Sequence, residues 1–327
     1  MGTMIRIQNL TKQYGGGRGI KNLNMEVPEK CVFGYVGPNG AGKSTTIKIL
    51  CGLVKPESGE AYIDGIPVLP KNHVQIKRTV GYLPDEFGVY DQMTVWEYLD
   101  FFGAAFKIPP KERRKQIQNV LELTAADHMK DYQVNSLSRG MHQKIGIAKT
   151  MLHDPKLLIL DEPANGLDPH ARIDMRNTIL RLKEIGKTVM LSSHILPELG
   201  SICDMVGIIE RGQLLTQGTV KEISQKLTEQ INLEIMVDSD IDEAARICRT
   251  FDQVKEVSFS GNEIRVEYLG KRQNLFELNK YLIDKGVRVM TLKESEVDLE
   301  NVFLAVTGKD KKFDLSKLDA QPAGSGS

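Results

Sequence analysis

The sequence predicts an α/β protein with a mostly parallel sheet, followed by a smaller α+β domain. Three observations support this fold class. Residues 31–53 read as a strand, a glycine-rich turn and a helix. Residues 157–160 are an apolar run that ends in two acids, as expected of a strand buried on both faces of a parallel sheet. After residue 230, the alternation of strands and helices starts again.

The first element, residues 31–36, is an apolar, β-prone strand that leads into the pattern G-x-x-x-x-G-K-S. Glycines let backbone N–H groups turn inward around a phosphate, and the new helix adds the positive end of its dipole. We expect Lys43 on the β- and γ-phosphates of a nucleotide, Ser44 on Mg²⁺ and Thr45 close behind. A chance glycine-rich turn is the alternative. The loop consists of Gly37, Pro38, Asn39, Gly40, Ala41, Gly42, Lys43, Ser44 and Thr45.

Two acids follow the apolar run 157–160. Asp161 lies at the carboxyl end of the predicted strand and so faces the phosphate loop, where we expect it to hold Mg²⁺ directly or through water. Glu162 points elsewhere and is the candidate that polarises the attacking water. The alternative for this pair is a solvated acidic turn before Pro163.

The remaining elements of the first domain can be placed coarsely. Strands at 4–7, 23–27 and 61–63 predict an antiparallel edge sheet near the nucleotide. A capping box at Thr94 opens a helix, the prolines at 109 and 110 end it, and residues 111–123 form another. Residues from about 86 to 153 are therefore expected to be a helical subdomain. A hairpin follows at 206–218.

With these motifs in this order, the chain resembles the ATP-binding-cassette (ABC) ATPases over about residues 4–220. Leu137-Ser138-Arg139-Gly140-Met141 matches the family's signature loop, usually L-S-G-G-Q, which binds the γ-phosphate held by the opposite subunit. Ser138 precedes a predicted helix whose N-terminus suits an anion, although a simple helix cap is the alternative. Arg139 and Met141 depart from the family pattern. Similar S-x-G-M-x-Q-K signatures occur in exporters that have a type-2 permease.

The resemblance also assigns roles outside these loops. It implies that Asp168 is the key acid of the loop through which subunits communicate, and that His194 contacts the γ-phosphate. Tyr14 matches the aromatic residue on which adenine stacks, with packing in the small sheet as the alternative. Asp85 stands where the family has a glutamine that touches Mg²⁺. Because an ionised Asp cannot donate a hydrogen bond, we expect metal sensing there with a different coupling geometry.

One phosphate loop and one signature loop do not complete a site, so the resemblance implies a partner. This partner is a second copy of the chain or another ABC ATPase subunit. We expect ATP hydrolysis with Lys43, Asp161, Glu162 and His194 as catalytic residues. A separate integral membrane permease is expected to dock beside Asp85, where aromatic residues gather and could otherwise form subdomain core. The chosen docking residues are Phe87, Tyr90 and Trp96.

Composition narrows the class of protein further. The 43 basic and 43 acidic residues balance, which argues against a nucleic-acid partner held by bulk charge. The 4 cysteines form no C-x-x-C pair, which favours a reduced cytosolic protein. No signal peptide and no apolar run of about 20 residues is visible. We therefore expect a peripheral protein, held at the cytoplasmic face of the plasma membrane by its permease.

The second half of the chain predicts a βαββαβ order across 232–292, which suggests a small ferredoxin-like domain. The expected organisation is a nucleotide-binding domain at 1–220 and an accessory domain at 221–308, which ends in a segment (298–308) similar to the ending of exporter subunits. A polar tail at 309–327 finishes in what resembles an engineered linker. The accessory domain is expected to stabilise the dimer or to regulate it.

The sequence leaves two alternative functions to compare with this one. A soluble cassette that remodels nucleic acid or ribosomes, or acts as a scaffold, would carry a long coiled coil or two cassettes. This chain shows neither sustained heptads nor a second loop. A nonhydrolytic nucleotide sensor conflicts with the intact Lys43, Asp161, Glu162 and His194. The sequence does not indicate the transported substrate, because in this architecture the cargo passes through the permease.

Overall fold

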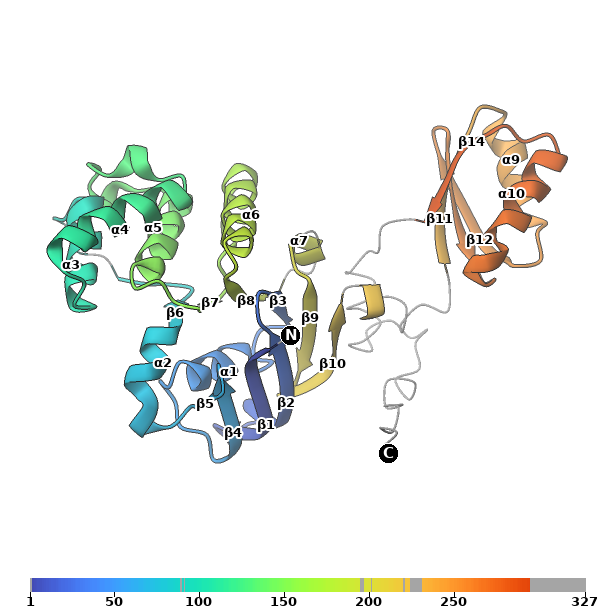
Figure 1. Cartoon of the computed structure of the whole chain (residues 1–327). Helices are drawn as coiled ribbons and strands as arrows, with labels where there is room; N and C mark the ends of the chain where they lie inside the picture. Colours follow the sequence, from blue (N-terminus) through green and yellow to red (C-terminus); the bar gives the residue numbers. More distant parts are fainter. Residues whose placement is uncertain are drawn as a thin grey trace. The chain divides into compact units, whose positions relative to one another are not determined.

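A computed structural model describes residues 2–88, 90, 92–194, 197–200, 202–219, 221–223 and 231–294. The chain divides into two compact units, one containing Met1–Val220 and the other Lys221–Val302 (Figure 1). The segments predicted at 298–308 and 309–327 lie outside the described residues.

The larger sheet of the first unit has the strand order β10-β9-β3-β8-β7-β6. β3 pairs in parallel with β8 and β9, β7 pairs in parallel with β6 and β8, and β9 and β10 form an antiparallel hairpin. Every residue of β3 and β7 is buried, which explains their uninterrupted apolar sequences. The strands are β3 (Val32–Val36), β6 (Val80–Leu83), β7 (Leu157–Leu160), β8 (Thr188–Ser193), β9 (Met205–Glu210) and β10 (Gln213–Thr219).

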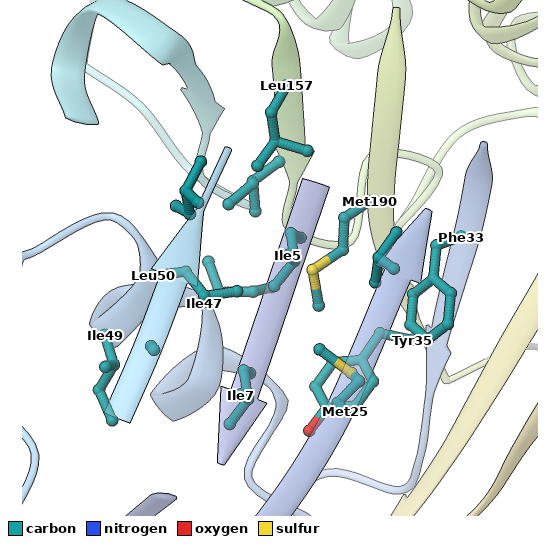
Figure 2. Close-up of a cluster of buried hydrophobic side chains, with 14 of the residues drawn as sticks. Ile5, Ile7, Met25, Phe33, Tyr35, Ile47, Ile49, Leu50, Leu157 and Met190 are labelled. Atoms are coloured by element: carbon teal, nitrogen blue, oxygen red, sulfur yellow. The ribbon is translucent and has the colours of Figure 1, made fainter. Parts of the chain in front are cut away.

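A second, antiparallel sheet has the order β2-β1-β4-β5. Its strands are β1 (Thr3–Gln13), β2 (Gly19–Pro28), β4 (Ser58–Ile63) and β5 (Ile66–Pro67), so they extend well beyond the predicted ranges. Register shifts in β1 at 7–10 and 10–12 interrupt the alternation there, which is why the sequence pattern ends too early. Figure 2 shows the shared core, in which Ile5 and Met25 of this sheet lie near Tyr35, Ile47 and Met190.

Helices complete the first unit. α3 begins as predicted with a capping box, in which Thr94 Oγ1 accepts from Glu97 N and the Glu97 carboxylate accepts from Thr94 N. α1 ends at Leu50, earlier than the predicted 53. The helices are α1 (Lys43–Leu50), α2 (His73–Thr79), α3 (Val95–Ala105), α4 (Pro110–Leu123), α5 (Arg139–Met151), α6 (Pro169–Glu184) and α7 (Pro197–Gly200). Short 3₁₀ turns lie at Pro70–Asn72, Asp127–Met129 and Val134–Ser136.

The second unit has its own sheet, with strand order β12-β13-β11-β14, all antiparallel. Its core is formed by one face of this sheet and by the buried sides of α9 and α10, including Ile235, Cys248 and Leu282. The elements are β11 (Ile231–Val237), α9 (Ile241–Arg249), β12 (Val254–Ser260), β13 (Glu263–Tyr268), a 3₁₀ turn (Arg272–Asn274), α10 (Leu275–Asp284) and β14 (Val289–Glu294). The last strand begins two residues later than predicted.

Candidate functional site

The phosphate loop joins β3 to α1 and depends on glycine for its shape. Gly40 and Gly42 have φ angles of 81° and 112°, which side-chain-bearing residues rarely adopt. A Cβ at Gly42 would also lie 2.7 Å from the carbonyl oxygen of Gly19, so no larger residue fits there. Gly42 precedes α1 without a side-chain cap. The first N–H groups of the helix therefore have no side-chain acceptor and remain suited to an anion.

A cavity of about 480 Å³ opens at this loop. Its walls come from the loop itself, the turn between β1 and β2, and the residues that follow β6, β7 and β8. The lining residues are Tyr14, Arg18, Gly19, Pro38, Asn39, Gly40, Gly42, Lys43, Ser44, Thr45, Asp85, Asp161, Glu162, Asn165 and His194. The structure thus brings together most of the predicted nucleotide and metal residues, from five separate segments of the chain.

Lys43 and His194 each contact a different carboxylate oxygen of Glu162. The Lys43 ammonium is buried, donates to Gly37 O at 2.6 Å and lies 3.2 Å from Glu162 Oε1. His194 Nδ1 lies 2.8 Å from Glu162 Oε2. Glu162 has a φ of 51°, so the chain turns sharply at this residue and carries its side chain toward the loop. The carboxylate therefore sits between a fixed cation and an imidazole.

Asp161 lies deeper, with 5% of its surface exposed. Ser192 Oγ donates to Asp161 Oδ1 at 2.6 Å and accepts from Glu162 N at 2.9 Å. One serine therefore fixes both acids, and the sequence analysis missed it. The available signal was the change from apolar residues to two serines at the end of the strand 188–193. Arg18 and Asn165 were also missed, although both line the cavity.

The signature residues do not line this cavity, within the part of the chain that the structure describes. Ser138 caps α5, where its Oγ accepts from Met141 N at 3.4 Å, so the capping interpretation holds in this subunit. Gly140 allows α5 to approach α6 closely, because an added Cβ would lie 2.7 Å from Ala171 Cβ. The Arg139 guanidinium lies 3.9 Å from Asp85 Oδ1.

The structure places Asp168 at the start of α6 and Tyr14 at the mouth of the cavity. Asp168 Oδ1 accepts from Ala171 N at 2.9 Å and caps α6, with Pro169 in the first turn. Tyr14 is 54% exposed at the mouth of the cavity, with the Lys12 ammonium 5.6 Å from its ring centre. Its ring is therefore not packed in the core of the small sheet, and adenine stacking on it stays a prediction.

The residues present suit Mg²⁺ held together with a nucleotide. Ser44, Asp85 and Asp161 offer oxygen atoms, the ligands this cation prefers. The described residues contain no group of three or more His, Cys, Asp or Glu side chains that would hold a metal alone. A few protein oxygens beside a phosphate loop match the usual magnesium site, in which phosphates and waters supply the remaining ligands.

Aromatic rings gather between α3, α5 and the segment after β6. Phe87 stacks on His142 with ring centres 4.2 Å apart, and Tyr90 meets Phe101 at 5.2 Å. Trp96 takes part in none of the ring contacts found among the described residues. The Lys149 ammonium lies 4.3, 5.1 and 5.9 Å from the ring centres of Phe87, Phe102 and Tyr98. We call these six residues, Phe87, Tyr90, Tyr98, Phe101, Phe102 and Lys149, the aromatic cluster.

Replacing Lys149 with Met should stabilise the protein by about 1 to 2 kcal/mol at pH 7. Burial lowers the pKa of Lys149 to about 8, whereas the rings favour its cation and offset part of this cost. The unfolded chain binds the proton up to about pH 10.4, so the cost of the charge falls as pH rises from 8 toward that value. Urea unfolding followed by Trp96 fluorescence, with Lys115→Met as an exposed control, should show the advantage shrinking between pH 7 and 9.5. A stability gain of Lys149→Met that stays constant between pH 7 and 9.5 would contradict a lowered pKa for Lys149.

A parallel sheet, a glycine loop opening a helix, and acids at the next strand end define a phosphate-binding-loop nucleotide-binding protein. Comparison with known proteins narrows this class. The family model for ABC transporters matches residues 20–165. The bacitracin transport ATP-binding protein BcrA of Bacillus licheniformis is 36% identical over 311 residues, covering 94% of this chain and 98% of that protein. The chain therefore belongs to the ATP-binding proteins of ABC transporters, a family of ATPases.

Other relatives and solved structures agree. The linearmycin resistance ATP-binding protein LnrL of Bacillus subtilis is 31% identical, covering 94% of this chain and 99% of that protein. An uncharacterised ABC transporter ATP-binding protein of Synechocystis is 41% identical, but the match covers 62% of this chain and 57% of that protein. The structure of CbiO1 from Clostridium perfringens superposes with a TM-score of 0.61 at 28% identity, covering 69% and 95%. A dimeric, ADP- and Pi-bound structure of the cassette MJ0796 gives 0.59 at 26% identity, covering 66% and 99%.

Among the helices that the structure describes, none has both the length and the apolar composition of a membrane span.

Proposed function

We propose that this chain closes on ATP as a dimer and uses hydrolysis to drive a separate membrane permease. The observation that carries the proposal is that only one of the two phosphate-binding elements, the phosphate loop, lines the cavity. The cavity of one chain holds Lys43, Glu162 and His194 but not Ser138 or Gly140 of the same chain, among the residues described. A complete site therefore needs the signature loop of a second copy. The dimeric cassette among the similar structures supports this arrangement.

Within the proposed site, Lys43 and His194 bind the γ-phosphate from one subunit, and Ser138 and Gly140 bind it from the other. Tyr14 stacks on the adenine, and the loop N–H groups hold the remaining phosphates. Ser44, Asp161 and Asp85 would hold Mg²⁺, which would neutralise charge on the phosphates when bound. Glu162 accepts a proton from the attacking water as the bond between the β-bridging oxygen and the γ-phosphorus breaks. Asp168 belongs to the loop through which the two subunits would communicate.

Hydrolysis would remove the γ-phosphate contacts that join the two copies. The open and closed arrangements then differ in free energy by those contacts, so ATP shifts the equilibrium toward closure and product release reverses it. A permease bound to both copies would follow this cycle. We place residues 221–308 as an accessory domain that stabilises or regulates the dimer.

The proposed transport direction is export, at the cytoplasmic face of the plasma membrane. The support comes from nearly full-length similarity to a bacitracin transport protein and a linearmycin resistance protein, together with the S-x-G-M-x-Q-K signature. The substrate belongs to the permease and is not proposed. The similarity to these relatives favours a transport subunit over a soluble remodelling factor.

The test of the dimer is the dependence of ATPase activity on protein concentration. Activity per chain should rise with concentration and level off as the dimer fills, in parallel with ATP-dependent mass measured by light scattering. Specific activity that stays constant while the protein sediments strictly as a monomer would overturn the proposal.

The permease is proposed to dock beside Asp85, at Phe87, Tyr90 and Trp96. Tyr90 is 49% exposed and meets the exposed ring of Phe101, which is the arrangement of a rigid aromatic anchor. Tyr90→Ser should therefore reduce recovery of the integral membrane partner from detergent-solubilised membranes by about tenfold. Tyr132→Ser, at an equally exposed tyrosine outside the aromatic cluster, is the control. Equal recovery with both variants would place the docking surface elsewhere.

A further inference from the structure

Two of the positions at which this chain departs from the family pattern, Asp85 and Arg139, lie next to each other. Asp85 follows β6, and Arg139 opens α5. The Arg139 guanidinium lies 3.9 Å from Asp85 Oδ1, and both side chains are nearly half exposed. A glycine at 139 would have no side chain to reach this carboxylate, and a glutamine at 85 would carry no charge to attract one. The opposite charges at the two departures are therefore complementary within one subunit.

Further contacts hold this pair in place. Asn165 Nδ2 donates to Asp85 Oδ1 at 3.3 Å, so the carboxylate is bound from a second side. The Arg139 side chain also passes directly over Gly166, where an added Cβ would lie 2.9 Å from Arg139 Cζ. Gly166 has a φ of 68°, which also favours glycine. Arg139 is thus held between Asp85 and Gly166 of its own chain.

Asp85 faces a second set of charges as well. It lines the same cavity as Lys43, Asp161 and the phosphate loop, where the nucleotide and its cation bind in the proposed function. A carboxylate that turns toward a divalent cation loses much of its attraction for a guanidinium, because the metal cation repels the positively charged guanidinium. An exposed ion pair of this length is weak and is easily exchanged.

We infer that Arg139 is a γ-phosphate ligand that Asp85 holds in reserve until the cavity of its own subunit is loaded. In the resting subunit, Asp85 and Asn165 retain the arginine against Gly166. When the cavity fills, Asp85 turns to the metal–nucleotide complex and Arg139 becomes free to bind the triphosphate held by the other copy. Loading of one site would thereby prepare the signature loop for the opposite site. This inference rests on the proposed function, since it requires the signature loop to act on the second copy.

The test is a double-mutant cycle between Asp85→Asn and Arg139→Gln, in a Glu162→Gln background that prevents turnover. The readout is the ATP concentration at half-maximal dimerisation, measured by light scattering with Mg²⁺ present. Asp85→Asn alone loses a metal contact and also frees Arg139, whereas in the R139Q background it only loses the metal contact. The cycle cancels the metal contribution and leaves the interaction between the two positions. Asp85→Asn should therefore raise the midpoint about two- to fivefold more in the R139Q background than in its absence.

A second ion pair supplies the control. Lys144 of α5 and Asp174 of α6 lie 2.7 Å apart, away from the cavity, so a Lys144→Gln and Asp174→Asn cycle should show no such interaction. Equal effects of Asp85→Asn in both backgrounds would overturn the inference. Failure of every variant, including the Glu162→Gln parent, to dimerise on ATP would overturn the proposed function instead. The two failures are thus distinguishable.

Discussion

Glu162→Gln should reduce ATP turnover by about 10²- to 10⁴-fold and convert the protein into a stable ATP-bound dimer. Gln keeps the size and the hydrogen-bonding oxygen of the side chain but cannot accept a proton from the attacking water. The same change removes the negative charge that lies 3.2 Å from the Lys43 ammonium. A lysine freed from this ion pair is available to a phosphate, so binding of ATP should be retained or strengthened while hydrolysis fails.

Two measurements on one sample check this result. Phosphate release gives the turnover, and light scattering with and without ATP gives the mass. Glu112→Gln, at an exposed acid in the first turn of α4, removes the same charge far from the cavity and should behave as the unaltered protein. Normal turnover in the Glu162→Gln variant would exclude Glu162 as the proton acceptor. A loss of turnover together with a loss of ATP binding would instead assign Glu162 a binding role.

The phosphate loop could be predicted from sequence because its causes are local. Gly40, Gly42 and Lys43 act within a few residues of one another, and the flanking strand and helix have clear patterns. The same is true of Asp161, which ends an apolar run, and of the cap at Ser138. In each case the local backbone geometry decides the role that the side chain can play. The family membership shown by the comparisons agrees with this part of the reading.

The contacts of Glu162 could not be predicted in the same way. Glu162 lies beside Asp161 in the sequence, but its partners Lys43 and His194 lie in segments that follow other strands and meet it only when the parallel sheet forms. Ser192 illustrates the same limit, because its bonds to two neighbouring acids depend on the pairing of β7 with β8. Residue type and spacing indicate which side chains can react. Only the sheet order decides which of them touch.

The charged contacts between distant parts of the chain also could not be predicted from the sequence. Asp85 was assigned to the metal and Arg139 to the opposite subunit's phosphate, and nothing local suggests that they meet. Lys149 was not singled out in the sequence, yet three aromatic side chains surround its ammonium. Both features arise where α5 packs against the segment after β6. Pairwise packing of distant elements therefore sets the electrostatics that a linear pattern cannot show.

Mixing two inactive variants should restore ATPase activity if the site is shared between copies. Lys43→Met removes the phosphate-loop cation, and Ser138→Asp adds a negative charge where the opposite γ-phosphate would bind. Asp is among the best residues for capping a helix, so this change should preserve α5 while repelling the phosphate. Each variant alone should lose at least about 10²-fold in turnover, because each has two defective sites.

A mixed dimer contains one site with both defects and one site with neither. The intact site combines the unaltered Lys43 of the Ser138→Asp chain with the unaltered Ser138 of the Lys43→Met chain. In a random equimolar mixture, half of the dimers are mixed and each has one of its two sites intact, so activity should recover to about a quarter of the normal value if the sites act independently. A site built within one chain would give no recovery at any mixing ratio. Recovery therefore distinguishes a shared site from two self-contained sites without any assumption about the permease, because Lys43 lines the cavity of its own chain and Ser138 does not.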